Sequence, residues 1–340
     1  MISGVRNFAI ACCAATLLAA PAGAGEPVNL RIGWVQIGHV TPMYDVLVKR
    51  HPDLFPHYGK SYTAEGVRFN GTTPEIQAMA VNELEIASMA SSSMTLGVTN
   101  AHLDMVMVCD LIQDGRPGGF DEPFVVKKDG PIKTIEDIKG KRIATNAIGS
   151  ASDTSMRMML RKHNIQDADF TTIEANFANM FAMIEDDKVD LIPLLPDSLK
   201  QVRDNGRYRT LFTAGQARGP AETVAWGMRA SFIKAHRAEL VDFFEDHLRA
   251  LHWFIDPKNH AEAVAIAAQV SKKKPEELDY FFTKDDFYRD RDAMPDLQAA
   301  QKEIDDSVKL GILQKGITLV PGYVDLTLIE DAKKRLAEGG

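Results

Sequence analysis

Small hydroxyl residues that could do chemistry gather within residues 143–162, "IATNAIGSASDTSMRMMLRK". The stretch is typical of a short strand, a Gly/Ser loop and an amphipathic helix. Ser150 and Ser152 could therefore cap the helix, help its first amides bind an anion, or act as nucleophiles. "GSASD" has Asp153 where the motif G-x-S-x-G needs its second glycine, so no nucleophile elbow is indicated. Capping and anion binding both stay open.

Two charged residues bear on the anion hypothesis. Asp153 suits the positive end of the helix dipole, but beside a bound anion its carboxylate would be repulsive. It is either a solvated acid of the first turn or a cleft residue that favours a ligand with a cationic end. Arg116, in a Gly/Pro-rich loop, is the best nearby cation for an anionic ligand, with a solvated loop arginine as the alternative.

Other chemistries find little support in the sequence. The histidines show no H-x-H or HExxH spacing, and no dinucleotide fingerprint or P-loop is present, so we expect neither a metal nor a cofactor. The formal charge of −8 and the scattered Lys and Arg residues argue against a nucleic acid or an anionic membrane as partner. Cys109 lies in the apolar run "LDMVMVCDLI", which predicts a buried, inert thiol.

The first 24 residues have the layout of a secretory signal peptide. Arg6 precedes an apolar run at 8–20, and Ala22-Gly23-Ala24 provides a small-residue exit, so we expect cleavage after Ala24. The run is shorter than the ~20 residues that a spanning helix needs. Loss of Arg6 takes the charge from −8 to −9. We therefore predict an exported, soluble protein in which one cysteine remains and no internal disulfide forms.

The remaining chain alternates between strand and helix patterns. Apolar runs such as "LEIASMA" and "LDMVMVCDL" fit strands buried on both faces, and Thr41-Pro42 and Thr73-Pro74 fit helix starts. Gly/Pro-rich residues 113–123 interrupt a first α/β unit, a second unit follows, and helices are expected over most of 262–337. Crossings near 110–127 and 211–228 would join two lobes around a ligand cleft.

Several segments resemble one family of transport proteins. "VVKKDGPIKTIEDIKGKRIATNAIGSASDTSMRMMLRKHNI", "NELEIASMASSS" and "FANMFAMIEDDKVDLIPLLPD" are similar to periplasmic substrate-binding proteins of ABC importers for taurine, aliphatic sulfonates and nitrate. The resemblance implies an α/β, type II periplasmic binding-protein fold. Lobe I would comprise 25–115 plus 221–340 and lobe II 116–220. It also implies a monomer in the periplasm that passes a small molecule to an importer permease.

The resemblance also implies which loops would line the ligand pocket. The implied residues are Gln36, His39, Ser91, Ser92, Ser150, Ser152, Asp153, Pro196 and Asp197. The chain departs from the family at Leu194-Leu195-Pro196, where an aromatic-acid-proline trio is common, and at "QDGRPGGFDEP", which has no counterpart.

These departures bear on the ligand and leave its identity open. We expect a polar, anionic organic ligand, and sulfonate, taurine, nitrate and aromatic carboxylate all remain candidates. Two alternative functions are also open. One is an enzyme related to thiamine-pyrimidine synthases or desulfinases, and the other is a ligand-sensing subunit.

Overall fold

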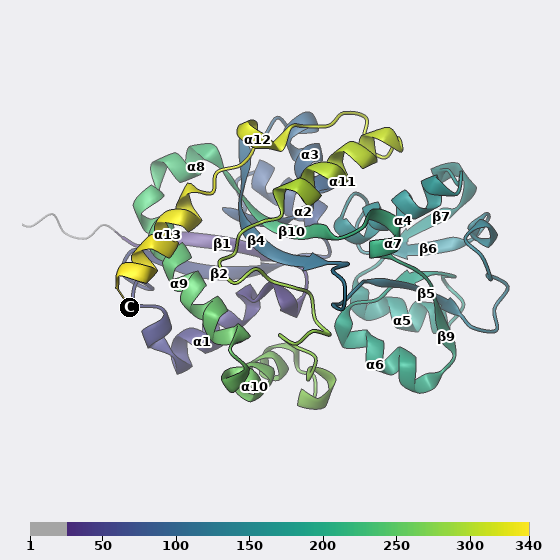
Figure 1. Ribbon diagram of the computed structural model, residues 1–340, viewed down its shortest axis with the longest axis horizontal. Helices are drawn as coiled ribbons and strands as arrows, with labels where there is room; N and C mark the ends of the chain where they lie inside the picture. Colours follow the sequence, from purple (N-terminus) through teal and green to yellow (C-terminus); the bar gives the residue numbers. More distant parts are fainter. Residues whose placement is uncertain (1–25, 340) are drawn as a thin grey trace, which may run out of the picture.

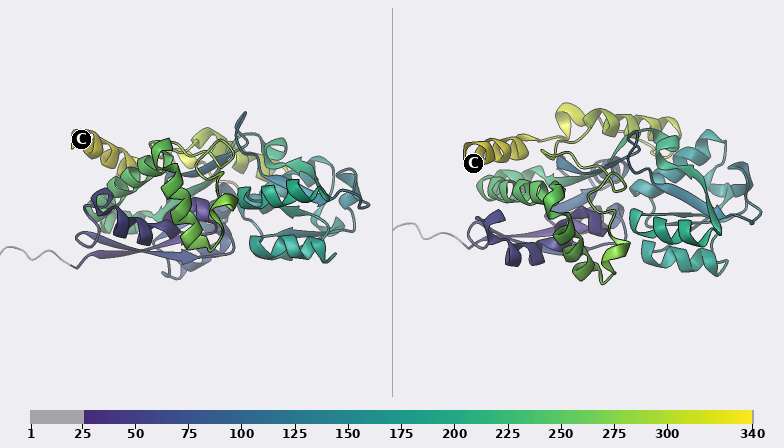
Figure 2. Two further views of the ribbon diagram at one scale, coloured as in Figure 1. Left: turned by 90° about the horizontal axis from the view of Figure 1, so that it is seen from below. Right: turned by 60° about the horizontal axis from the view of Figure 1, so that its bottom comes forward.

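The computed structural model describes residues 26–339, so the expected signal peptide at 1–24 lies outside the described residues. Its elements form two groups that lie side by side in Figure 1 and stay separate in both views of Figure 2. We call the group built on β1–β4 and β10 the first lobe. The group built on β5–β9 is the second lobe.

One five-stranded sheet organises the first lobe, in the order β2-β1-β3-β10-β4. β1 is parallel to β2 and β3, whereas β10 is antiparallel to both of its neighbours. β3 is buried along its whole length, as its apolar run predicts. Because β10 follows the second lobe in sequence, the chain returns to complete this sheet. The strands are β1 Val28–Trp34, β2 Tyr62–Arg68, β3 Ile86–Met89, β4 Met105–Asp114 and β10 Ala221–Arg229.

Helices cover both faces of this sheet (Figure 1). Leucine and phenylalanine side chains of α9 are buried, and its Phe243 and Phe244 contact Trp226 of β10. Trp226 and Cys109 are fully buried in the same core, which confirms the buried thiol that the sequence predicts. No helix among residues 26–339 is long and apolar enough to cross a membrane. The helices are α1 Tyr44–Arg50, α2 Thr72–Ala80, α3 Ser91–Asn100, α8 Ala230–Ala235, α9 Arg237–Ile255, α10 His260–Ser271, α11 Leu297–Lys309, α12 Leu319–Gly322 and α13 Thr327–Glu338.

Residues 272–296 differ from the sequence prediction, which made most of the last third helical. They contain no α-helix. Instead they run beside β4, the edge strand, where Gln113 and Tyr288 exchange backbone hydrogen bonds of 2.8 and 2.9 Å. The backbone N–H and C=O groups of an edge strand need partners, and this segment supplies some of them. The helical prediction was therefore wrong here, and the segment reaches the junction of the lobes.

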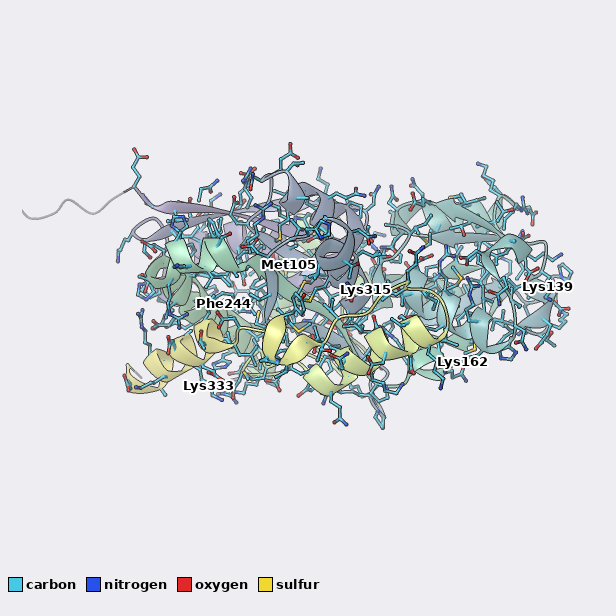
Figure 3. All side chains as sticks on the ribbon, turned by 90° about the horizontal axis from the view of Figure 1, so that it is seen from above. Met105, Lys139, Lys162, Phe244, Lys315 and Lys333 are labelled. Carbon is cyan, nitrogen blue, oxygen red and sulfur yellow. The ribbon has the colours of Figure 1, made fainter. Side chains whose placement is uncertain are left out.

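The second lobe contains a three-stranded antiparallel sheet, β8-β5-β9, and a parallel pair, β6-β7. The amide of Ala144 in β6 donates to the Leu191 carbonyl at 2.9 Å and joins the two sheets. Figure 3 shows Lys139 and Lys162 on this lobe, and Met105 and Phe244 on the first. Its elements are β5 Pro123–Lys127, β6 Arg142–Thr145, α4 Ala151–Lys162, β7 Thr171–Glu174, α5 Phe177–Glu185, β8 Ile192–Pro193, α6 Pro196–Asn205, β9 Tyr208–Thr213 and α7 Ala214–Arg218.

Candidate functional site: a cavity between the lobes

A cavity lies where the two lobes meet, with about 370 Å³ of space that no atom fills, part of it open to solvent. Both lobes and the crossing between β4 and β5 line it. The first lobe contributes Val35, Gln36, His39, Thr72, Ile112, Thr223, Val224 and Phe287. The second lobe and the crossing contribute Glu122, Asn146, Ser150, Ala151, Ser152, Phe177 and Leu195.

Four helices begin at this cavity. Thr72 is the first residue of α2, Ser150 is the N-cap of α4, Phe177 begins α5, and Leu195 is the N-cap of α6. The first amides of a helix lack intrahelical acceptors and carry partial positive charge. No side chain caps α2, α4 or α6, whereas Asn176 caps α5. The site therefore offers positive helix ends from both lobes, which suits an oxyanion.

The serine hydroxyls at the start of α4 do not accept hydrogen bonds from the first amides of this helix. Ser150 Oγ donates to Asn146 Oδ1 at 2.7 Å and to the Ala147 carbonyl at 2.8 Å. Ser152 Oγ donates to Glu122 Oε1 at 2.6 Å. Neither serine caps the helix, which leaves these amides without a side-chain acceptor. Both serines line the cavity.

Thr72 adds a polar group with no protein partner. The residue is 3% exposed, and its Oγ1 has no hydrogen-bond partner among the described residues. A buried hydroxyl without a partner costs about 1–3 kcal/mol. Because Thr72 lines the cavity, a bound ligand can supply the missing acceptor.

Asp153 does not line the cavity. Its carboxylate accepts the Gly149 amide and Arg157 Nε, each at 2.8 Å, and the residue is buried. Burial raises the pKa of this carboxyl, and the Arg157 guanidinium opposes that shift. The i, i+4 spacing of the pair explains the orientation, because such residues are neighbours on one helix face. Its charge is thus balanced within α4.

Gln36 and His39 line the cavity from the loop after β1. His39 ends a 3-10 turn at Ile37–His39, and its Nδ1 lies 3.1 Å from Ser88 Oγ. Burial, and secondarily the charge of Arg289, lower the pKa of His39 to about 3, so the ring is neutral at pH 7. Arg289 also donates to the Gly38 carbonyl at 2.8 Å and so fixes the turn that carries His39.

Ser91 and Ser92 do not line the cavity. Ser91 begins α3, and its buried Oγ has no partner in the described chain. Ser92 Oγ donates to the Gly149 carbonyl at 3.0 Å and accepts from Thr154 Oγ1 at 2.9 Å. Ser92 therefore links α3 of the first lobe to α4 of the second.

Asp197 also makes a contact between the lobes instead of lining the cavity. Its carboxylate pairs with Lys273 Nζ at 2.6 Å, and Pro196 likewise lies outside the lining. Arg116 stacks on the ring of Tyr288, 3.9 Å from the centroid, and does not reach the cavity.

The sequence prediction missed Glu122, the acid that lines the cavity. The residue is 2% exposed and lies in the crossing between β4 and β5. Burial and the charge of Asp114 raise the pKa of Glu122 to about 8, against the opposing effects of Ser152 and Arg218. No local pattern marks it, because most of these partners are far away in the sequence.

The lining as a whole combines donor groups with an apolar surface. Of the described residues, those that line the cavity include no lysine or arginine. An anion here would depend on helix ends and neutral donors. The apolar side is formed by Val35, Ile112, Phe177, Leu195, Val224 and Phe287. A ligand with an oxyanion at one end and an apolar body would match both sides.

Two further cavities have a less suitable chemistry. One lies on the second lobe beside Lys127, whose Nζ pairs with Asp187 at 2.6 Å. The other is larger, and its charged lining residues are Asp121 and Asp285, which would repel an anion. Neither contains a residue that the sequence analysis selected for the site.

One group outside the cavity has metal-ligand residue types. His57, Asp242 and Glu245 bring one possible ligand atom each within 4.8 Å of one another. Asp242 already pairs with Arg335 at 2.7 Å, and Glu245 pairs with Arg249. The arginines balance these carboxylates, so the geometry alone does not require an ion.

Comparisons with known proteins identify the family. The sequence profile of the NMT1-like family matches residues 23–268. The chain belongs to the NMT1-like family. A search of the curated proteins found no match.

Solved structures share the fold at low identity. The alkanesulfonate-binding protein SsuA from Xanthomonas axonopodis pv. citri, bound to MOPS, is 19% identical with a TM-score of 0.67, covering 88% of this chain and 99% of its own. The periplasmic nitrate-binding protein NrtA from Synechocystis PCC 6803 is 15% identical with a TM-score of 0.64, covering 92% and 89%. The desulfurization enzyme DSZB is 12% identical with a TM-score of 0.60, covering 91% and 99%. The predicted periplasmic binding-protein fold is confirmed.

Proposed function

We propose that this NMT1-like protein is a solute-binding protein whose ligand is a small organic anion, a sulfonate or carboxylate with an apolar body. One observation carries the proposal: four helix starts and the unpartnered Thr72 hydroxyl meet an apolar surface in one cavity between the lobes. The oxyanion would accept hydrogen bonds from the first amides of α4, and the apolar body would contact Phe177 and Phe287.

Binding in such a cavity would favour the closed arrangement of the lobes. A ligand shifts a conformational equilibrium by its preference for one state, and here both lobes contribute contacts to it. We propose 25–115 plus 221–340 and 116–220 as the two bodies that move. The contacts of Ser92 with Gly149 and of Asp197 with Lys273 would form on closure.

The proposed setting is the periplasm, where a monomer would present its ligand to the permease of an ABC importer. The signal-peptide pattern of residues 1–24 supports export. The family and the fold shared with SsuA and NrtA are consistent with this role.

DSZB shares the fold, so the fold alone does not separate binding from catalysis. The described cysteine, Cys109, is fully buried and lies outside the cavity lining, and burial raises the pKa of its thiol well above the usual range. This environment does not favour a thiolate nucleophile. We therefore rank binding above catalysis.

A thermal-shift screen tests the proposal. The panel contains benzoate, benzenesulfonate, taurine, methanesulfonate and nitrate, with benzylamine as a cationic comparator. A ligand at 100 times its Kd stabilises the folded protein by about 2.7 kcal/mol, so a true ligand raises Tm measurably. The compound must also be recovered unchanged, since turnover would favour the enzyme alternative. A shift with benzylamine alone would contradict the anion preference.

Thr72→Val provides a sharper test, because valine keeps the shape of the side chain and removes the hydroxyl. We expect the affinity for the oxyanion to fall about tenfold or more, since a hydrogen bond to a charged group is worth about 1.5–3 kcal/mol. Stability should not fall, because no protein bond is lost. Ser91→Ala is the matched control, because it also removes a buried hydroxyl that has no hydrogen-bond partner among the described residues, but one that lies outside the cavity lining. If Thr72→Val and Ser91→Ala bind the anion with equal affinity, the Thr72 hydroxyl does not contact the ligand.

A further inference from the structure

Glu122 places a carboxyl group directly in the cavity where an anion is expected. Its backbone is fixed, because its carbonyl accepts the Ala214 amide at 2.8 Å. Its Oε1 accepts the Ser152 hydroxyl at 2.6 Å. Because Oε1 accepts this bond, the proton of the neutral acid lies on the other oxygen, Oε2, and can be donated into the cavity that Glu122 lines. The protonated side chain thus has one hydrogen bond left to donate.

The charges around Glu122 are predominantly negative. Asp114 of β4 and the adjacent Asp121 face it, and the guanidinium of Arg218 in α7 opposes them. Arg218 is shared, because it also pairs with Asp114 at 3.0 Å and with Glu303 of α11 at 2.5 Å.

The uncharged groups around Glu122 do not offset this excess. Ser152 of α4 is a neutral donor, and His39, which lines the same cavity, is neutral at pH 7. The buried cluster around Arg218 contains two carboxyl groups, Asp114 and Glu303, and only one guanidinium. Burial and this excess both favour the neutral acid and raise the pKa of Glu122 to about 8.

We propose that Glu122 binds the ligand as a neutral carboxylic acid that donates a hydrogen bond to the oxyanion, so that ligand binding takes up a proton under alkaline conditions. This inference rests on the proposed function. An ionised Glu122 would repel an oxyanion inside the same low-dielectric cavity, whereas the neutral acid adds a donor to those of the helix starts. The four helix ends disfavour a cationic ligand there. Glu122 thereby selects for singly charged organic acids over amines.

The test measures Kd from pH 6 to pH 10 with benzenesulfonate and benzoate as probes, since neither probe titrates in this range. We expect a constant affinity below about pH 8 and a fall of about tenfold per pH unit above it, because only the protonated site binds. Calorimetry in buffers of different ionisation enthalpy should count about one proton taken up per anion bound near pH 9.

Glu122→Gln tests whether the pH dependence of binding comes from the proton on this side chain. The amide still donates a hydrogen bond but does not titrate, so the affinity of this variant should not change with pH across this range. Asp121→Asn is the matched control: it removes the neighbouring acid, which lies outside the cavity lining, so the loss of affinity at alkaline pH should persist with its midpoint at a somewhat lower pH. Proton uptake by the unmodified protein provides a readout that does not require either variant to fold.

Distinct outcomes separate this inference from the proposed function. An anion that binds equally at pH 6 and pH 10 without proton uptake would overturn the role of Glu122 alone. The same conclusion holds if Glu122→Gln keeps the alkaline loss of affinity. Absence of binding by every anion of the panel would overturn the proposed function, and the inference would fail with it.

Discussion

The neutral state of Glu122 predicts a pH-dependent stability that needs no ligand. The pKa of Glu122 is raised from the ordinary 4.5 to about 8, so between these pH values the folded chain binds one more proton than the unfolded chain. This contribution to stability is complete below pH 4.5 and is lost as the pH rises to 8. Over this window it changes the free energy of unfolding by about 5 kcal/mol, at ~1.4 kcal/mol per pH unit.

Chemical denaturation of the unmodified protein and of Glu122→Gln at half-unit steps from pH 4.5 to 9 measures this effect. The stability of the variant relative to the unmodified protein should rise across the window and level off above pH 8. The difference removes the contributions of other buried acids, such as Asp246, whose pKa is raised to about 6, chiefly by burial. Parallel curves would show that Glu122 has the same pKa in the folded and unfolded chain, and so would contradict a neutral Glu122 in the folded protein at pH 7.

Three further predictions concern the junction of the lobes. Arg218→Met should lower the free energy of unfolding by about 3–5 kcal/mol in denaturant titrations, because it leaves two buried carboxylates without their cation; an unchanged midpoint would contradict this. Lys273→Met should weaken benzoate binding by no more than about fivefold, since a partly exposed ion pair with Asp197 is worth about 1 kcal/mol or less. High salt should produce a similar loss in the unmodified protein, and a larger loss would mean that Lys273 acts in another way. Phe287→Leu should lower the affinity for benzoate about two- to tenfold while leaving that for methanesulfonate unchanged, because an aromatic pair is worth about 0.5–1.5 kcal/mol beyond area burial; equal losses for both anions would argue against ring contact.

Much of the architecture could be predicted from local patterns. The apolar runs of β3 and β4 indicated strands buried in a sheet, and the Gly/Ser loop before α4 indicated a helix start. These features depend on residues close in sequence. The orientation of Asp153 also had a local signal, since Arg157 follows four residues later on the same helix.

The rest of the cavity depends on contacts between distant segments. Burial and the charge of Asp114 raise the pKa of Glu122, whereas Ser152 and Arg218 lower it. No spacing rule in the sequence connects these positions. Phe287 reaches the cavity because residues 272–296 pair with the edge strand β4 instead of forming a helix. Ser92 follows β3, where the resemblance implied a pocket residue, yet the approach of α4 makes it a contact between the lobes. Such outcomes follow from tertiary packing.

The most direct test of the central claim is a crystal structure of residues 26–340 with the anion from the panel that gives the largest thermal shift. We expect the oxyanion to lie within hydrogen-bond distance of the Ala151 and Ser152 amides, Thr72 Oγ1 and Glu122, with the apolar body against Phe177 and Phe287. An anion bound instead in the cavity beside Lys127, or a cationic group facing Glu122, would contradict it.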